Sequence, residues 1–189
     1  MKVIPLHQEE KKLIALAVDH NRQAQQQIYA KFSSKMLSLC RQYINDLHHA
    51  EDVMITGFMK VFTHLKKFEH KGSFEGWIRR IMIYECIDYL RVKKNNFNHQ
   101  DIEDVIINDN ESVYEMEDFS MDDIQNMIDN LPNGYKMVFN LYAIEGYKHQ
   151  EIAEMLNISE GTSKSQLSHA RKLLQQQIID LKNKLNGTT

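Results

Sequence analysis

Residues 131–174 read LPNGYKMVFNLYAIEGYKHQEIAEMLNISEGTSKSQLSHARKLL, and this pattern predicts a helix-turn-helix. The pair Leu131-Pro132 begins a first helix, and Gly146 lies where that helix should end. The apolar face of this helix is expected to consist of Val138, Phe139, Leu141 and Tyr142.

A second helix is expected from Lys148 to Leu156, followed by a turn at residues 157–159. Within it, Ile152, Ala153 and Leu156 should face inward, and the small Ala153 lets the following helix cross closely. Ser159 is a favourable N-cap for a third helix. The spacing is therefore that of a recognition helix placed behind a tight turn.

The third helix has an apolar stripe on one side and basic or polar residues on the other. The stripe is Leu167, Ala170, Leu174, Ile178, Leu181 and Leu185. The opposite face carries Lys164, Gln166, His169, Arg171 and Lys172. Basic residues of this kind neutralise phosphates, and amide or imidazole groups contact base edges. A solvated basic helix end that complements the helix dipole is the plainer alternative. Because the turn, the small residue and the cap agree as well, DNA binding is preferred.

The first hundred residues predict a second helical module. Helical apolar spacing runs from Leu13 to Leu90, with breaks near Asn45-Asp46 and at residues 70–73. Few glycines and only two prolines interrupt a chain rich in helix-forming residues. The expected fold is all-α, with two small helical domains at 10–95 and 119–185.

An acidic segment separates the two modules. Lys and Arg outnumber Asp and Glu by 16 to 10 in residues 1–100 and by 7 to 5 in residues 131–189, whereas residues 101–130 hold eleven acids and no basic residue. Residues 96–118 are therefore expected to be a solvated linker. A less favoured alternative is that its carboxylates imitate nucleic acid and shield a basic surface.

The segment FEGWIRRIMIYECIDYLR, residues 74–91, mixes aromatic and basic residues, and a glycine-bearing loop precedes it. An unpaired base that stacks on an aromatic ring gains about 1–3 kcal/mol. The loop from Lys66 to Ser73, with Arg79 and Arg80, is therefore a candidate DNA contact. Trp77 repeats at core spacing with Ile81, so a place in the hydrophobic core is preferred for it.

Several classes of function are disfavoured by the sequence. The apolar run Leu13 to Val18 is too short to cross a bilayer or to act as a signal peptide. Cys40 and Cys86 are far apart in the chain and are expected to be reduced, half-buried thiols of a cytoplasmic protein. No phosphate loop, nucleophile–base pair or metal-ligand spacing is found, so neither an enzyme nor a cofactor or metal is expected.

Residues 131–174 resemble region 4 of the extracytoplasmic-function RNA polymerase sigma factors. The resemblance rests on the LP opening, the EIA of the second helix and the S-x-G-T-x-K-S start of the third. It implies that this module reads the upstream promoter element. The implied DNA-facing residues are Thr162, Ser163, Lys164, Ser165, Gln166, His169 and Arg171.

The segment HAEDVMITGFMKVF, residues 49–62, is an amphipathic helix that resembles region 2.2 of the same family. The resemblance implies docking on core RNA polymerase through Glu51, Asp52, Ile55, Thr56, Met59 and Lys60.

Residues 74–91 resemble regions 2.3 and 2.4, which hold the downstream promoter element, although Met82 replaces a usual small residue and Tyr84 a usual Asn. The implied DNA contacts are Lys66, Lys67, His70, Lys71, Ser73, Arg79, Arg80, Tyr84 and Arg91.

Taken together, the sequence predicts a sigma factor that binds core RNA polymerase, recognises and opens promoter DNA, and is a candidate for control by an anti-sigma partner. Two rival hypotheses remain open at this level. One is a helix-turn-helix regulator that binds an operator without polymerase, and the other is a helical adaptor that binds only protein.

Overall fold

The computed structural model describes residues 6–96 and 119–186, and within these ranges all regular structure is helical, as predicted. The chain divides into two compact units, residues 1–98 and 99–189. The predicted acidic linker, residues 96–118, lies outside the described residues apart from Asn96, where a helix ends. Among the described residues, no helix is long and apolar enough to span a membrane.

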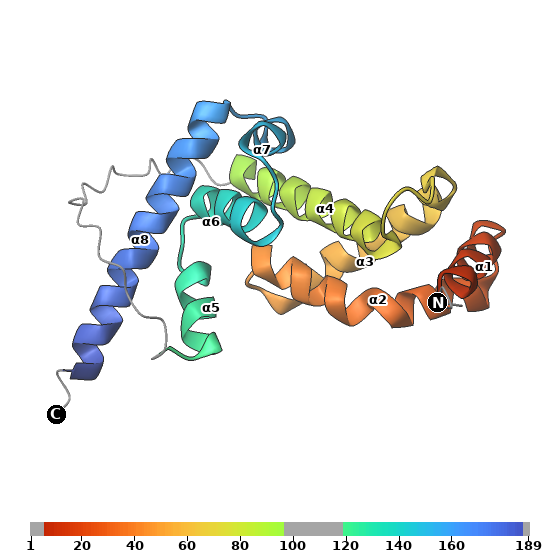
Figure 1. The fold of residues 1–189 in the computed structure, drawn as a ribbon, viewed down its shortest axis with the longest axis horizontal. Coiled ribbons are helices and arrows are strands. Elements are labelled where there is room, and N and C mark those ends of the chain that lie inside the picture. Colours follow the sequence, from red (N-terminus) through yellow and green to blue (C-terminus); the bar gives the residue numbers. More distant parts are fainter. Residues whose placement is uncertain (1–5, 97–118, 187–189) are drawn as a thin grey trace, which may run out of the picture. The chain divides into compact units, whose positions relative to one another are not determined.

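Unit 1 is a bundle of four α-helices (Figure 1): α1 (Leu6–Val18), α2 (Arg22–Tyr43), α3 (Leu47–His64) and α4 (Phe74–Asn96), with the short 3-10 helix η1 (Leu65–Lys67) after α3. Helices α2, α3 and α4 pack on one another, and α1 covers α2 and η1. The inward face of α2 consists of Ile28, Phe32, Met36, Leu39 and Tyr43, at steps of three and four residues. This is the periodicity that predicted a core-facing helix.

Local signals set the helix boundaries of unit 1. The side chain of Asn21 accepts a hydrogen bond from the backbone of Ala24 at 3.0 Å and begins α2. Asp46 accepts from the backbone of His49 at 2.9 Å and begins α3, at the predicted break. Gly72 has a φ of +87° in the loop before α4, a conformation that glycine adopts without strain.

Unit 2 consists of α5 (Met121–Asp129), α6 (Asn133–Phe139), the π-helical turn η2 (Asn140–Ile144), α7 (His149–Leu156) and the long α8 (Glu160–Asn186). Helices α5, α6 and α7 all pack on α8 (Figure 1). Ser120 begins α5 with a reciprocal cap, in which Asp123 also accepts from the Ser120 backbone. Lys136, although buried, forms an ion pair with Asp129 and so joins α6 to the end of α5.

The helix-turn-helix prediction is confirmed, with corrections in detail. The first helix ends in a π-helical turn, and Tyr142 on that turn is 36% exposed instead of lying in the core. In α7, Ile152 is buried as predicted, but the second buried residue is Met155, whereas Ala153 and Leu156 are half-buried. Of the predicted α8 stripe, Leu167 and Ala170 are fully inside. The rest of the stripe that the structure describes is half-buried: Leu174, Ile178 and Leu181.

Candidate functional site

The turn between α7 and α8 is fixed by backbone conformation and by a cap. Asn157 ends α7 in the left-handed region with a φ of +54°, a conformation to which asparagine is better suited than most residues. The Ser159 hydroxyl accepts a hydrogen bond from the backbone of Thr162 at 2.9 Å, as predicted for the N-cap of α8. It also lies 2.8 Å from the Thr162 hydroxyl. The start of α8 is therefore rigidly presented to solvent.

The predicted DNA-facing residues of α8 do not share one face. Lys164, Ser165 and Arg171 are exposed. Gln166 and His169 are half-buried on the side of α6, where Gln166 lies beside Gly134 and the His169 ring stacks on Tyr135 at 5.4 Å. The prediction that Gln166 and His169 lie opposite the apolar stripe was therefore wrong. Both side chains border the α6 contact and keep part of their surface in solvent.

Ser163 requires a further correction. Its side chain is fully buried, and its hydroxyl lies 2.9 Å from Nδ1 of His149 on α7. The predicted direct contact of Ser163 with DNA has no accessible surface to support it. The next inward position, Leu167, is one turn further along the helix, so Ser163 belongs to the face that packs on α7.

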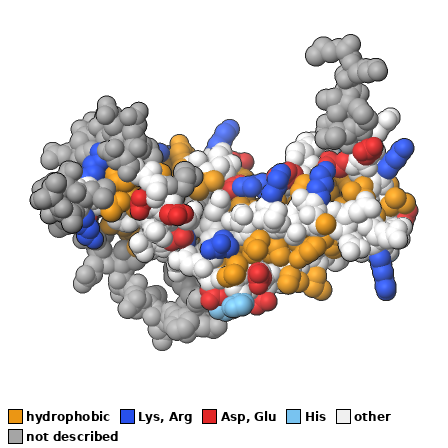
Figure 2. Space-filling view, turned by 90° about the horizontal axis from the view of Figure 1, so that it is seen from below, with side chains coloured by type: hydrophobic (Ala, Val, Ile, Leu, Met, Phe, Trp, Pro, Cys, Tyr) orange, Lys and Arg blue, Asp and Glu red, His pale blue; other side chains and the backbone are white. Residues whose placement is uncertain are grey.

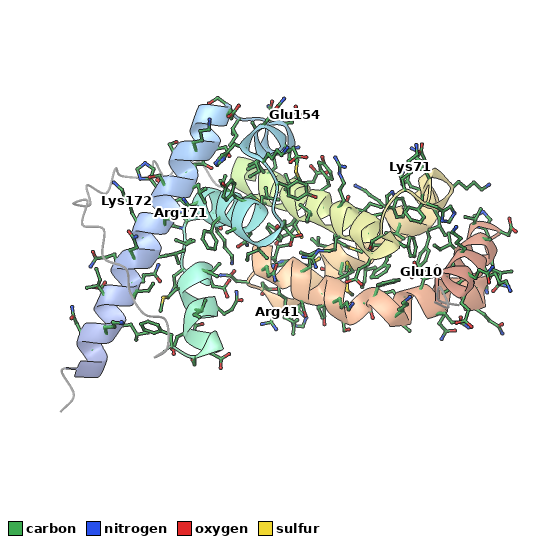
Figure 3. All side chains as sticks on the ribbon, in the orientation of Figure 1. Glu10, Arg41, Lys71, Glu154, Arg171 and Lys172 are labelled. Atoms are coloured by element: carbon green, nitrogen blue, oxygen red, sulfur yellow. The ribbon has the colours of Figure 1, made fainter. Side chains whose placement is uncertain are left out.

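Charged side chains on α8 have partners within the protein. Lys164 Nζ lies 2.7 Å from Glu160 Oε1, and the hydrogen bond and charge of Lys164 lower the pKa of Glu160. Glu160 is therefore ionised at neutral pH and partly offsets the charge of Lys164. The guanidinium of Arg171 lies 5.8 Å from the ring centre of Tyr142. Figure 3 shows Arg171 and Lys172 side by side on α8.

The short helix η1 and the loop before α4 expose five residues that were predicted to contact DNA: Lys66, Lys67, His70, Lys71 and Ser73. Lys71, which projects from this loop in Figure 3, forms an ion pair with Glu69 at 2.7 Å. Phe68 anchors the loop from below, with its ring 5.1 Å from Phe74 and 5.5 Å from Trp77. The aromatic residues therefore hold the loop, and Trp77, expected in the core, is half-buried at its edge.

The outer face of α4 continues from this loop. Arg80, Tyr84 and Arg91 follow one another at steps of four and seven residues and are exposed together. The guanidinium of Arg80 lies 6.0 Å from the Tyr84 ring centre, and Arg91 pairs with Asp88 at 3.1 Å. Arg79 is half-buried beside them. The helix thus offers a basic track with one accessible aromatic ring.

The predicted polymerase surface on α3 is accessible. Met59 is 66% exposed and Ile55 49%, which is high for side chains of this kind. A shallow groove of about 270 Å³ lies between α2 and α3 and is lined by Tyr29, Ser33, Ser34, Leu37, Glu51, Met54 and Ile55. Figure 2 shows hydrophobic side chains gathered beside acidic ones on this face of the molecule.

Some structurally important groups were not identified from the sequence. Lys60, predicted to contact polymerase, forms an ion pair with Glu85 of α4, whose side chain is buried.

Cys40 and Cys86 are fully buried, not half-buried, and remain free thiols. A hydrogen bond with Cys40 and burial raise the pKa of the Cys86 thiol far above its usual range. Among residues 6–96 and 119–186, no cluster of His, Cys, Asp and Glu could hold a metal ion.

Comparison with known proteins gives two family matches, one on each unit. Residues 28–96 match Sigma-70 region 2, and residues 121–174 match Sigma-70, region 4. The ECF RNA polymerase sigma factor SigW of Bacillus subtilis is 27% identical over 164 residues, which cover 79% of this chain and 86% of SigW. The ECF RNA polymerase sigma-E factor of Haemophilus influenzae is 25% identical over 171 residues, covering 82% and 87% of the two chains.

A solved structure shares the fold. It is the sigma factor RpoE in complex with the anti-sigma factor NepR from Bartonella quintana, with a TM-score of 0.53 and 20% sequence identity. The alignment covers 81% of this chain and 95% of that one.

Proposed function

The chain belongs to the extracytoplasmic-function sigma factors of RNA polymerase, and from this premise we propose how its two units divide the work of transcription initiation. The observation that carries the proposal is the order of the family matches, with region 2 on unit 1 and region 4 on unit 2. Unit 1 docks on core RNA polymerase and opens the downstream promoter element. Unit 2 binds the upstream element.

In unit 2 the DNA-facing set is Thr162, Lys164, Ser165, Gln166, His169 and Arg171. These residues lie on the first four turns of α8, behind the fixed turn at residues 157–159. Lys and Arg neutralise phosphates, whereas Gln166 and His169 carry the groups that can bond to base edges. Ser163 is left out of this set because its side chain is buried.

In unit 1 the downstream element is held by the loop at residues 66–73 and by the outer face of α4. Lys66, Lys67 and Lys71 supply charge for the phosphates of the separating strands. Tyr84 offers a ring on which an unpaired base gains about 1–3 kcal/mol. Binding energy of this kind opens the duplex, so we propose no enzymatic activity for the chain itself.

Core polymerase docks on α3 around Ile55 and Met59, with Glu51, Asp52 and Thr56 at the edge. Two large apolar side chains beside carboxylates form the kind of patch that an interface buries at its centre and surrounds with polar groups. Lys60 supports this surface from its pair with Glu85. The cytoplasm, where polymerase works, is the proposed location.

Control by an anti-sigma partner is also proposed, because the relative RpoE was solved with the anti-sigma factor NepR.

The decisive experiment mixes the purified chain with sigma-free bacterial core polymerase and follows the complex by gel filtration at low salt. The expected result is co-elution, together with initiation of transcription from defined fragments of the source genome. If the two proteins stay apart while the chain alone binds duplex DNA in a salt-dependent manner, the chain acts as a helix-turn-helix regulator without polymerase.

A further inference from the structure

A partly buried hydrogen bond joins the two helices of the helix-turn-helix. His149 is the first residue of α7, and its Nδ1 lies 2.9 Å from the hydroxyl of Ser163 on the first turn of α8. Ser163 has no exposed side-chain surface. A buried hydroxyl that loses its partner costs about 1–3 kcal/mol, so the bond restricts how α7 and α8 can lie against each other.

The same histidine is held from a second direction. Its ring stacks on Tyr142 of η2, with centroids 4.6 Å apart and an angle of 20° between the planes. Tyr142 in turn lies 5.8 Å from the guanidinium of Arg171. Ser163, His149, Tyr142 and Arg171 therefore form a continuous series of contacts. The series leaves α8 at its first turn and returns to it about 12 Å further along the helix axis.

The series of contacts also affects the residues next to Ser163 in the sequence. Thr162 and Lys164 stand on either side of it, and Ser165 follows. In a helix each residue is turned by about 100° from the next, so the orientation of Ser163 determines where these three side chains point. Groups that bond to DNA lose much of their contribution when they are displaced by about 1 Å.

We propose that His149 and Ser163 are positioning residues for recognition of the upstream promoter element, and that neither touches DNA. Their hydrogen bond holds α8 at one rotation against α7, so that the exposed Lys164 and Ser165 face the major groove. This inference rests on the proposed role of unit 2 as a DNA reader. It extends that role by naming the pair of residues between α7 and α8 on which discrimination between DNA sequences depends.

The test uses holoenzyme reconstituted from core polymerase and full-length chain. The measured quantity is the ratio of affinities for a promoter fragment and for the same fragment with its upstream element scrambled. Ser163→Ala removes the hydroxyl, and His149→Phe keeps a ring against Tyr142 but removes the bond. His149→Asn keeps a polar atom close to the position of Nδ1 but removes the ring. Ser168→Ala, which removes an exposed hydroxyl from the same helix, is the control.

We expect Ser163→Ala and His149→Phe each to reduce the ratio by about 5- to 10-fold, because each removes the hydrogen bond that holds α8 against α7. The double variant should lose no more than either single variant, since both remove the same bond. His149→Asn should retain most of the ratio, and Ser168→Ala all of it. Binding to core polymerase should be unchanged in every variant.

Other results overturn the inference. A wild-type ratio in both single variants, or losses that multiply in the double variant, would show that the bond does not position the helix. Retention by His149→Phe together with loss in His149→Asn would assign the effect to the ring stack instead. A purely structural role would lower the melting temperature of Ser163→Ala without changing the ratio. Failure of the proposed function is distinguishable, because the wild-type holoenzyme itself would then show a ratio of one.

Discussion

Gly57 of α3 lies directly against the thioether of Met82 in α4, so close that a Cβ at position 57 would overlap the sulfur. Met82 is fully buried. The missing side chain at one position therefore accommodates the large one at the other. Helix α3 carries the proposed polymerase surface and α4 the proposed DNA surface. The contact between Gly57 and Met82 therefore helps to set the distance between these two surfaces.

Replacing Gly57 with alanine should destabilise unit 1 by about 1–3 kcal/mol, because overpacking outweighs the gain of about 1 kcal/mol in helix propensity. Met82→Ala alone should cost about 2–5 kcal/mol through the cavity that it leaves. The double variant should lose clearly less than the sum of the two. Denaturant unfolding measures all three, and strictly additive losses would contradict the packing argument.

The ion pair between Lys60 and Glu85 leads to a second prediction. Lys60→Ala leaves a carboxylate that is only 8% exposed without its partner, and should lower the free energy of unfolding by about 1–3 kcal/mol. Adding Glu85→Gln should restore part of the loss, because it removes the uncompensated charge. Thermal unfolding compares both with Lys12→Ala, an exposed lysine on α1. If Lys60→Ala melts with the wild type, the pair contributes nothing to stability.

Substitutions in the apolar patch on α3 should weaken binding to core polymerase without changing the stability of the chain. Ile55→Ser and Met59→Ser should each weaken binding to core polymerase by about 10-fold, since side chains at the centre of an interface contribute about 1–2 kcal/mol or more. Their melting temperatures should stay at the wild-type value because both side chains are already in solvent.

Leu16→Ser is the matched control for docking, since Leu16 is an apolar residue on α1 that is 51% exposed, close to the 49% of Ile55. Fluorescence anisotropy of labelled chain titrated with core polymerase reports the affinities. Equal losses for Leu16 and Met59 would assign the effect to general surface hydrophobicity.

The pair of Glu160 and Lys164 predicts a gain of affinity. Glu160→Gln removes a carboxylate that is ionised at neutral pH and releases Lys164 for a phosphate. Binding of promoter DNA by the holoenzyme should become several-fold tighter and more salt-dependent, whereas Lys164→Ala should reduce the salt slope by about one. Asp180→Asn, further along α8, should leave both quantities unchanged. A Glu160→Gln holoenzyme that binds more weakly would show that the carboxylate orients Lys164 productively.

The side chain of Asp46 predicts that the stability of the folded chain decreases at acidic pH. The hydrogen bond from the His49 backbone lowers the pKa of Asp46 below its usual value of 3.8, so the folded state favours the ionised form. The stabilisation is therefore complete above pH 3.8 and is lost as the pH falls through the lower, folded-state pKa. Asp46→Asn keeps an N-cap but cannot titrate. As the pH falls below about 4, the unfolding midpoint of the wild type should decrease relative to that of Asp46→Asn. A constant difference throughout would exclude this contribution.

Much of the architecture was accessible from local sequence signals. Asp46, Ser159 and Gly146 mark helix ends through interactions with their own neighbouring backbone, so a reader of the sequence can locate them without knowing the fold. The apolar spacing of α2 identifies its inward face for the same reason. The order of the two helical modules follows from such signals, whereas the family was expected from the resemblance of the motifs within them.

Contacts between helices could not be predicted from local sequence signals. The sequence alone determined that the chain forms two helical modules, one of which ends in a helix-turn-helix, because helix periodicity and capping depend on residues a few positions apart. Only the tertiary structure decided that Ser163 is turned inward to His149, that Lys60 is paired with Glu85, and that Gly57 makes room for Met82. The physical reason is that each of these contacts depends on the distance and crossing angle between two helices. Those quantities result from the packing of all the side chains between them, and no local pattern in either helix carries that information.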